Sequence, residues 1–204
     1  MNFDVRTKWV FVRALAAFIA IMLCIRLLDL PLAAWVARYM GSHAPHLGTS
    51  DIPDLLLVSV VMLTALSWMG YFYLVRLGIL DRRTLFCQVT GTVLPLSFGI
   101  KTVLKWAFGR TETRVWLSDP SLYGFHWFAG MKGFQGFPSG HMLVFTPLFL
   151  ALWHFYPRYR LYYGVIWSGL GIALLVTEYH FLGDVVAGAG VGVLAYLVVR
   201  RTVG

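Results

Sequence analysis

Long apolar stretches, each close to the length that crosses a bilayer, dominate this sequence. A helix needs about 20 mostly apolar residues to span the hydrocarbon. Six stretches approach that length: about Trp9–Leu28, Leu55–Leu77, Thr84–Phe108, Ser139–Tyr156, Leu161–Tyr179 and Phe181–Val199. The chain is 59% hydrophobic and 13% charged, whereas soluble domains are about 45–50% apolar and about 25% charged. The sequence therefore predicts an all-α, six-span transmembrane helical bundle that forms one integral membrane domain over residues 1–204.

Basic residues separate the apolar stretches and do not gather in one patch. The net charge of +8 therefore points to membrane topology and not to nucleic-acid binding. Alternating connectors and termini carry basic pairs: Arg6 and Lys8, Arg82 and Arg83, Arg158 and Arg160, and Arg200 and Arg201. The positive-inside rule assigns these segments to the cytoplasm. We expect a bacterial inner-membrane protein with cytoplasmic termini, whose connectors at about 29–54, 109–138 and 179–181 face the periplasm.

Two of these outer connectors have unusual sequences. Leu30–Met40 is apolar with a few polar breaks, which is typical of a helix lying in the membrane interface. Arg110–Phe137 is rich in aromatic residues, which favours an aromatic belt at headgroup level, a loop folded over a lipid-binding site, or both. In the last stretch, the glycines of Gly188–Gly192 predict close helix packing.

Ionisable residues near membrane spans are costly and tend to be functional. Three such clusters occur: Lys101, Lys105, Arg110 and Arg114 at the outer end of the third span; Ser139, Gly140 and His141 at the start of the fourth; Glu178, His180 and Asp184 between the fifth and sixth. The chain crosses the membrane and returns between the second and third clusters. Span counting therefore predicts that all three meet at the outer face.

The three clusters have complementary chemistry. Lysine and arginine bind phosphate, and a helix that starts at Ser139 and Gly140 offers free backbone N–H groups to an anion. His180 and Asp184 are one helical turn apart, so the carboxylate can hold one imidazole nitrogen and leave the other to attack. His141 can then protonate a leaving oxygen.

These motifs resemble the type-2 phosphatidic-acid phosphatase superfamily, which includes vanadium haloperoxidases. Its second motif is intact as Pro138-Ser139-Gly140-His141, and so is the second half of its third, His180-Phe-Leu-Gly-Asp184. Order, spacing and the six-span layout match from about residue 95 onwards. The resemblance implies a phosphohistidine intermediate on His180, with Asp184 orienting that ring and His141 as the general acid, and it implies no metal and no cofactor.

The sequence departs from the family pattern at two places. Glu112 stands where the first motif has arginine, so Arg110 or Arg114 is expected to supply the guanidinium. Ala173 and Leu174 stand where the third motif has Ser-Arg. The sphingolipid synthases also lack that pair, which favours phosphotransfer as an alternative to hydrolysis. Glu178 is either an interfacial carboxylate or a residue that binds a cation or a hydroxylated acceptor.

The predicted function is a membrane lipid phosphatase that acts on a lipid phosphate or diphosphate, with its catalytic motifs within residues 101–184. One alternative is a phosphotransferase that moves the phospho-group to a second acceptor. Another is a catalytically inactive lipid-binding membrane protein. A metal or haem protein is disfavoured because the sequence has no His-Glu-x-x-His and no ligands at metal spacing. The sequence names neither the lipid nor an oligomeric state.

Overall fold

The computed structural model describes residues 5–40 and 51–203, which form helices joined by turns and loops. Helix α1 (Val5–Leu23) continues through a π-helical turn, η1 (Cys24–Leu28), into α2 (Asp29–Tyr39). The other long helices are α3 (Asp51–Arg76), α4 (Arg82–Phe108), α6 (Gly140–Phe155), α7 (Arg160–Val176) and α8 (Leu182–Val203). The short elements are α5 (Thr113–Ser118), η3 (Pro120–Leu122) and η4 (Pro157–Tyr159). The all-α prediction is confirmed, because the described ranges contain no strand beyond one isolated bridge.

Four helical segments among the described residues are long and apolar enough to cross a membrane: Leu15–Tyr39, Leu55–Arg76, Pro157–Val176 and Leu182–Val203. The chain is an integral membrane protein, as its composition predicts. The other two predicted spans also form helices, but α6 has only 16 residues and α4 carries charged residues near both ends. The described part of the chain therefore gives four clear spans where the sequence predicts six.

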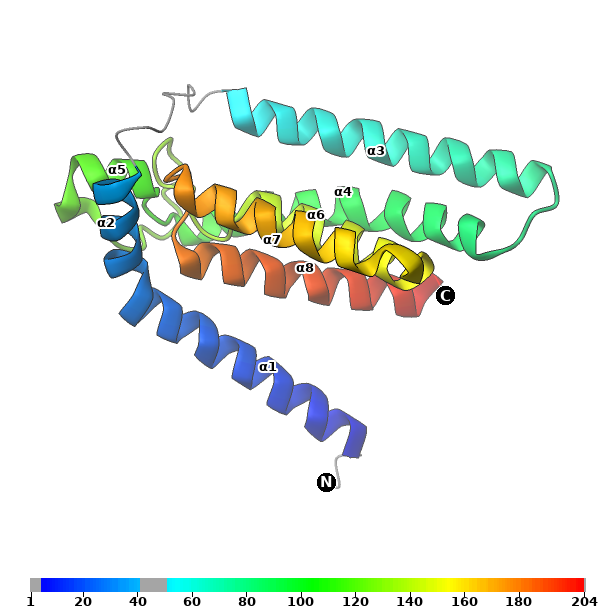
Figure 1. Cartoon of the computed structure of the whole chain (residues 1–204), viewed down its shortest axis with the longest axis horizontal. Helices are drawn as coiled ribbons and strands as arrows, with labels where there is room; N and C mark the ends of the chain where they lie inside the picture. Colours follow the sequence, from blue (N-terminus) through cyan, green and yellow to red (C-terminus); the bar gives the residue numbers. More distant parts are fainter. Residues whose placement is uncertain (1–4, 41–50, 204) are drawn as a thin grey trace.

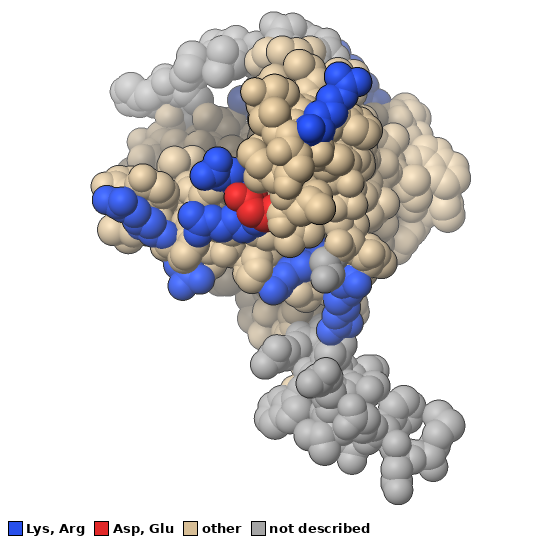
Figure 2. All heavy atoms as spheres, turned by 90° about the vertical axis from the view of Figure 1, so that its right-hand side faces the viewer, with Lys and Arg blue, Asp and Glu red and all other residues tan. Residues whose placement is uncertain are grey.

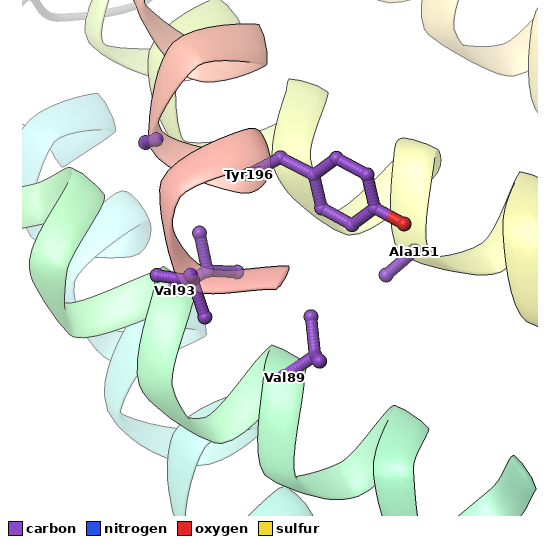
Figure 3. Packing of buried hydrophobic residues seen from close by; sticks show 6 residues of the cluster. Val89, Val93, Ala151 and Tyr196 are labelled. Atoms are coloured by element: carbon purple, nitrogen blue, oxygen red, sulfur yellow. The ribbon is translucent and has the colours of Figure 1, made fainter. Parts of the chain in front are cut away.

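The centre of the bundle is formed by α4, α6 and α8, which pack against one another, while α3 contacts α4 from outside. Figure 1 shows these helices and α7 running side by side along the long axis of the molecule. A buried apolar cluster joins the three central helices, with Val89 and Val93 from α4, Ala151 from α6 and Tyr196 from α8 (Figure 3).

Glycines allow α8 to approach α6 closely. A Cβ at Gly188 would overlap the backbone carbonyl oxygen of Ser139, and one at Gly192 would lie 2.8 Å from the carbonyl oxygen of Leu143. The predicted small-residue packing face is confirmed. This approach holds the first turn of α6 against α8, next to the motif residues.

The segment predicted as an interfacial helix forms α2. Figure 1 shows α1 leaving the bundle at an angle and α2 turning from it to lie across one end, near α5. Helix α2 contacts α7 and α8, and η1 contacts α8. Asp29, Ala33 and Val36 form its buried face, whereas Trp35 and Tyr39 are exposed.

Candidate active site

Three segments that carry predicted site residues meet at the end of the bundle covered by α2: the C-terminal end of α4, the start of α6 and the turn between α7 and α8 (Figure 1). The backbone N–H of Ser139 donates a hydrogen bond to the carbonyl oxygen of Asp184 (3.0 Å). This bond ties the Pro-Ser-Gly-His turn to the first turn of α8. The structure therefore brings the motifs around His141 and His180 together.

His180 and Asp184 form a buried pair at the start of α8. Asp184 Oδ2 accepts a hydrogen bond from the backbone N–H of Phe181 (3.0 Å) and lies 3.7 Å from His180 Nδ1. Burial lowers the pKa of His180, because desolvation disfavours the charged imidazolium. Neither ring nitrogen has a hydrogen-bond partner among the described residues. His180 thus has a lowered pKa and lies beside the carboxylate of Asp184.

His141 lies close to His180, across one tyrosine. The ring centroid of His141 is 5.8 Å from that of Tyr179, and the Tyr179 ring lies 4.9 Å from the His180 ring. Burial raises the pKa of Tyr179, which keeps its hydroxyl protonated. The predicted nucleophile and general acid therefore flank the same aromatic ring.

Arg110 is buried in an ion-paired network behind the histidines. Its Nη1 lies 2.5 Å from Asp184 Oδ1, and its Nη2 lies 2.6 Å from Asp29 Oδ2 and 2.9 Å from the Tyr123 hydroxyl. Burial alone would lower the pKa of this guanidinium, but the carboxylates of Asp184 and Asp29 raise it above its ordinary value. Both terminal nitrogens of Arg110 are thus already engaged by protein groups.

Aromatic rings surround this guanidinium. Its central carbon lies 5.0 Å from the Phe181 ring centroid, 5.2 Å from Phe125 and 5.5 Å from Tyr123. Such contacts stabilise a buried cation. Phe125 and Tyr123 come from the aromatic loop, so part of that loop folds over the site. Trp127 and Phe128 of the same loop are 61% exposed, in keeping with a membrane-interface belt. The loop thus covers part of the candidate site and also exposes aromatic side chains, and both interpretations of the loop stay predictions.

Asp29 is a member of this network that the sequence analysis missed. Besides Arg110, it contacts α8, because its Oδ1 accepts the backbone N–H of Gly183 (2.7 Å). A signal was present in the sequence: Asp29 is an isolated carboxylate at the end of an apolar stretch. Such a residue is a functional candidate by default.

Lys101, Lys105 and the start of α6 are the other groups predicted to bind phosphate. The methylenes of Lys101 pack on Gly140, where a Cβ would lie 3.1 Å from Lys101 Cδ, so glycine leaves room for this side chain. Lys105 is half-buried and lies one helical turn further along α4. The hydroxyl of Ser139 is buried and has no hydrogen-bond partner among the described residues. A buried unpartnered hydroxyl at a helix start is well suited to an anion.

Arg114 and Glu178 lie at the edge of the site, beside the turn that ends α7. Arg114 Nη2 donates to the carbonyl oxygen of Thr177 (2.8 Å), and its guanidinium lies 5.9 Å from the Tyr179 ring centroid. Glu178 has a φ of 57°, a left-handed conformation that is uncommon for a non-glycine residue. It lines a narrow cleft of about 10 Å³, together with His180, Asp29 and apolar residues of α2. The cleft has room for about one water molecule.

Leu174 occupies the position at which the third motif of the family has arginine. Its side chain is 7% exposed and packs with Met142 and Val185 in an apolar cluster. A guanidinium at this position would enter that cluster. At this position the chain makes an apolar packing contact.

Comparison with known proteins agrees with this geometry. Residues 84–204 match the family model of the PAP2 superfamily. A lipid A 1-phosphatase of Rhizobium johnstonii is 26% identical over 177 residues, which cover 85% of this chain and 72% of that protein. A lipid A 1-phosphatase of Rhizobium etli is 31% identical over 101 residues, which cover 50% of this chain and 43% of that protein. No solved structure matches. The family match covers more than half of the chain and includes both histidine motifs, and the chain belongs to the PAP2 superfamily.

Proposed function

We propose that this protein is a membrane lipid phosphatase that cleaves the phosphate from a phosphorylated lipid through a phosphohistidine intermediate. The observation that carries the proposal is the buried His180, whose ring nitrogens lack partners among the described residues, beside Asp184 and across Tyr179 from His141. The lipid A 1-phosphatases to which the chain is similar make lipid A 1-phosphate the first substrate to test.

The proposed reaction has two displacements at phosphorus. In the first, Nε2 of His180 attacks in line, an N–P bond forms, and the P–O bond to the lipid breaks. His141 gives its proton to the departing lipid oxygen. Asp184 accepts a hydrogen bond from the Nδ1–H of the ring that becomes positive, and the 3.7 Å separation would shorten as that charge develops. In the second, water attacks phosphorus, gives a proton to His141, and releases phosphate and neutral His180.

The negative charge on the transferred phosphate needs cationic and N–H partners. Lys105, Lys101 and the start of α6 at Ser139 and Gly140 are the proposed ligands, with Arg114 at the edge. Electrostatic stabilisation of this kind supplies most of the rate enhancement in phosphoryl transfer. That Arg110 binds phosphate directly stays a prediction, since both its terminal nitrogens already contact protein groups.

The proposed topology has six membrane crossings, with both termini in the cytoplasm and the site at the periplasmic face of a bacterial inner membrane. Exposed basic residues at the opposite end of the bundle support this orientation. Membrane-impermeant thiol labelling of single cysteines introduced at Ser121 and Arg158 tests it. Labelling in intact cells is expected at the first position only, and the reverse pattern would invert the topology.

Removing either histidine should abolish phosphate release from purified protein. We expect His180→Ala to lose on the order of 10⁴-fold or more in kcat, because the nucleophile is removed. His141→Ala should lose about 10²–10⁴-fold. His154→Ala, an exposed histidine near the other end of α6, is the matched control and should keep full activity.

The assay should follow release of inorganic phosphate from lipid A 1-phosphate, together with acid-labile, base-stable radiolabel on the protein. Label on the wild type and His141→Ala, but not on His180→Ala, is expected. Near-normal turnover by folded His180→Ala would refute the mechanism. A wild-type protein without activity on any phosphorylated lipid would favour the inactive lipid-binding alternative.

Phosphotransfer to a second lipid is the other candidate. One observation favours it: Leu174 makes an apolar contact at the position where the family motif has a cation. Glu178 is then the candidate that binds a hydroxylated acceptor. Adding a second lipid with a free hydroxyl group and measuring phosphorylated acceptor against free phosphate separates transfer from hydrolysis. Glu178→Gln should reduce the transferred fraction more than the total turnover.

A further inference from the structure

Asp29 belongs to the one part of the site that lies outside the segment matched by the PAP2 family model. That match begins at residue 84, whereas Asp29 is the first residue of α2. Its side chain is fully buried and uses both oxygens: Oδ2 lies 2.6 Å from Arg110 Nη2, and Oδ1 accepts the Gly183 N–H at 2.7 Å. One carboxylate thus joins the N-terminal segment to the aromatic loop and to α8.

The surroundings of Asp29 are built to hold it there. The π-helical turn η1 directly precedes Asp29, and the carbonyl oxygen of Ile25 in that turn accepts a hydrogen bond from Tyr123 (3.2 Å). On the opposite side, a Cβ at Gly183 would lie 2.6 Å from Ile25 Cγ1 and 3.0 Å from Asp29 Oδ2. Only glycine at this position lets the turn and the carboxylate approach the start of α8.

The charges of the network explain what Asp29 contributes. Arg110 lies between two buried carboxylates, Asp29 and Asp184, and the three side chains together carry one net negative charge when both carboxylates are ionised. Asp184 uses Oδ1 for Arg110 and turns Oδ2 towards His180. If Asp29 were neutral, the guanidinium would offset the charge of Asp184 completely. When Asp29 is ionised, it balances part of the positive charge of Arg110, so the negative charge of Asp184 still stabilises a positive charge on His180.

We propose that Asp29 is a positioning residue of the reaction: through Arg110 it fixes the orientation of Asp184 and preserves its negative charge for His180. The positive charge that develops on His180 during attack on phosphorus is then stabilised by a carboxylate that Arg110 orients but does not neutralise. The inference rests on the proposed phosphohistidine function. It extends the functional site to a helix that the family match does not cover.

Neutral and charged variants at position 29 separate positioning from a merely structural role. Asp29→Asn keeps an acceptor for Gly183 and removes the charge, and it should lower kcat about 10–100-fold, as for outer partners of other functional histidines. KM should change little, because Asp29 does not contact substrate. Asp29→Glu keeps the charge and should recover most of the lost kcat. Asp81→Asn, an exposed carboxylate at the other end of the bundle, is the matched control and should match the wild type.

The pH profile gives a readout that a structural role would not move. Loss of the Asp29 charge removes support for the imidazolium of His180, so the acid limb of kcat/KM should move to lower pH in Asp29→Asn. The other charged or titratable groups near His180 are unchanged in this variant: Arg110, Glu112, Lys105, His141, Glu178, Tyr179 and Asp184. Thermal unfolding in detergent shows whether each variant is folded.

Each result of these measurements either supports or overturns the proposed role of Asp29. Folded Asp29→Asn with kcat within about twofold of the wild type and an unmoved acid limb overturns the role of Asp29 and leaves the proposed function standing. A wild type that releases no more phosphate than His180→Ala overturns both. If Asp29→Asn does not fold, Asp29→Ser is measured by the same criteria, and failure of both neutral variants to fold would identify Asp29 as structural.

Discussion

The two ends of the helical bundle differ in that buried charged side chains occur at only one of them among the described residues. At the end covered by α2, Arg110 lies 2.6 Å from Asp29 and 2.5 Å from Asp184, and all three side chains are fully buried. At the other end, basic side chains spread over the surface (Figure 2). They include Arg82, Arg83, Arg158, Arg200 and Arg201.

The exposed basic residues at one end are expected to orient the chain in the membrane, whereas the buried charges at the other end are expected to serve the candidate site. Exposed basic residues keep their hydration and bias the topology of the helices without needing a defined geometry. Buried charges lose hydration, which costs several kcal/mol per ion unless partners replace it. A bundle that keeps three of them at one end therefore has a use for them there, and the neighbouring histidines indicate what that use is.

The largest effect expected from this comparison is at Arg110. Arg110→Ala leaves two buried carboxylates without their cation, which should lower the free energy of unfolding by about 3–5 kcal/mol and abolish activity. Arg83→Ala is the matched control, because Arg83 lies 3.7 Å from Asp81 with both side chains exposed, and such a pair contributes about 0–1 kcal/mol. Thermal unfolding in detergent measures both. Equal losses at the two positions would remove the distinction between the two ends.

The next largest effect is at Lys105, which lies at the same end but is proposed to face substrate. Lys105→Ala should lower kcat/KM by about 10²–10³-fold, the loss typical of one group that stabilises developing charge. Its unfolding temperature should stay near that of the wild type, because no ion pair of Lys105 occurs among the described residues. Phosphate release and thermal unfolding, measured on the same preparation, check this. A large loss of stability with normal turnover in the folded fraction would make Lys105 structural.

The smallest effect is expected from the close packing of α8 against α6. Gly188→Ala places a methyl group against the carbonyl oxygen of Ser139, which should destabilise the protein by about 1–3 kcal/mol and reduce activity by shifting the start of α6. Gly190→Ala on the same helix has open space around the new methyl group and should leave both properties unchanged or slightly improve stability. If the two variants behave alike, close α6–α8 contact is not needed for the site.

The sequence predicts most helices well because apolar run length is a local signal. The boundary between α7 and α8 was less accurate: the predicted spans end at Tyr179 and resume at Phe181, whereas the helices end at Val176 and resume at Leu182. The apolar residues continue through this turn, so composition alone does not mark it. The left-handed Glu178 is what turns the chain there.

In the candidate site, too, the residues in short local motifs were predicted, whereas contacts between distant segments were missed. His141, His180 and Asp184 follow from short motifs whose spacing is meaningful within one or two helical turns. The sequence marks Asp29 as an isolated carboxylate but does not reveal its partner, because Arg110 lies 81 residues away and no local pattern connects them. The surroundings of Arg110 were missed for the same reason, since two carboxylates from distant segments determine which way its guanidinium points.

The π-helical turn at Cys24–Leu28 connects two helices that have different roles, α1 and α2. Over residues 15–23, α1 exposes apolar side chains, whereas α2 carries the Asp29 carboxylate at a fixed point. A π turn holds one residue more than an α-helical turn, and each residue of an α-helix turns it by about 100°. Deleting one residue here would rotate α1 by that amount relative to α2 while Asp29 kept its place. The turn thus allows the rotation of α1 in the bilayer to be set independently of the position of Asp29 in the site.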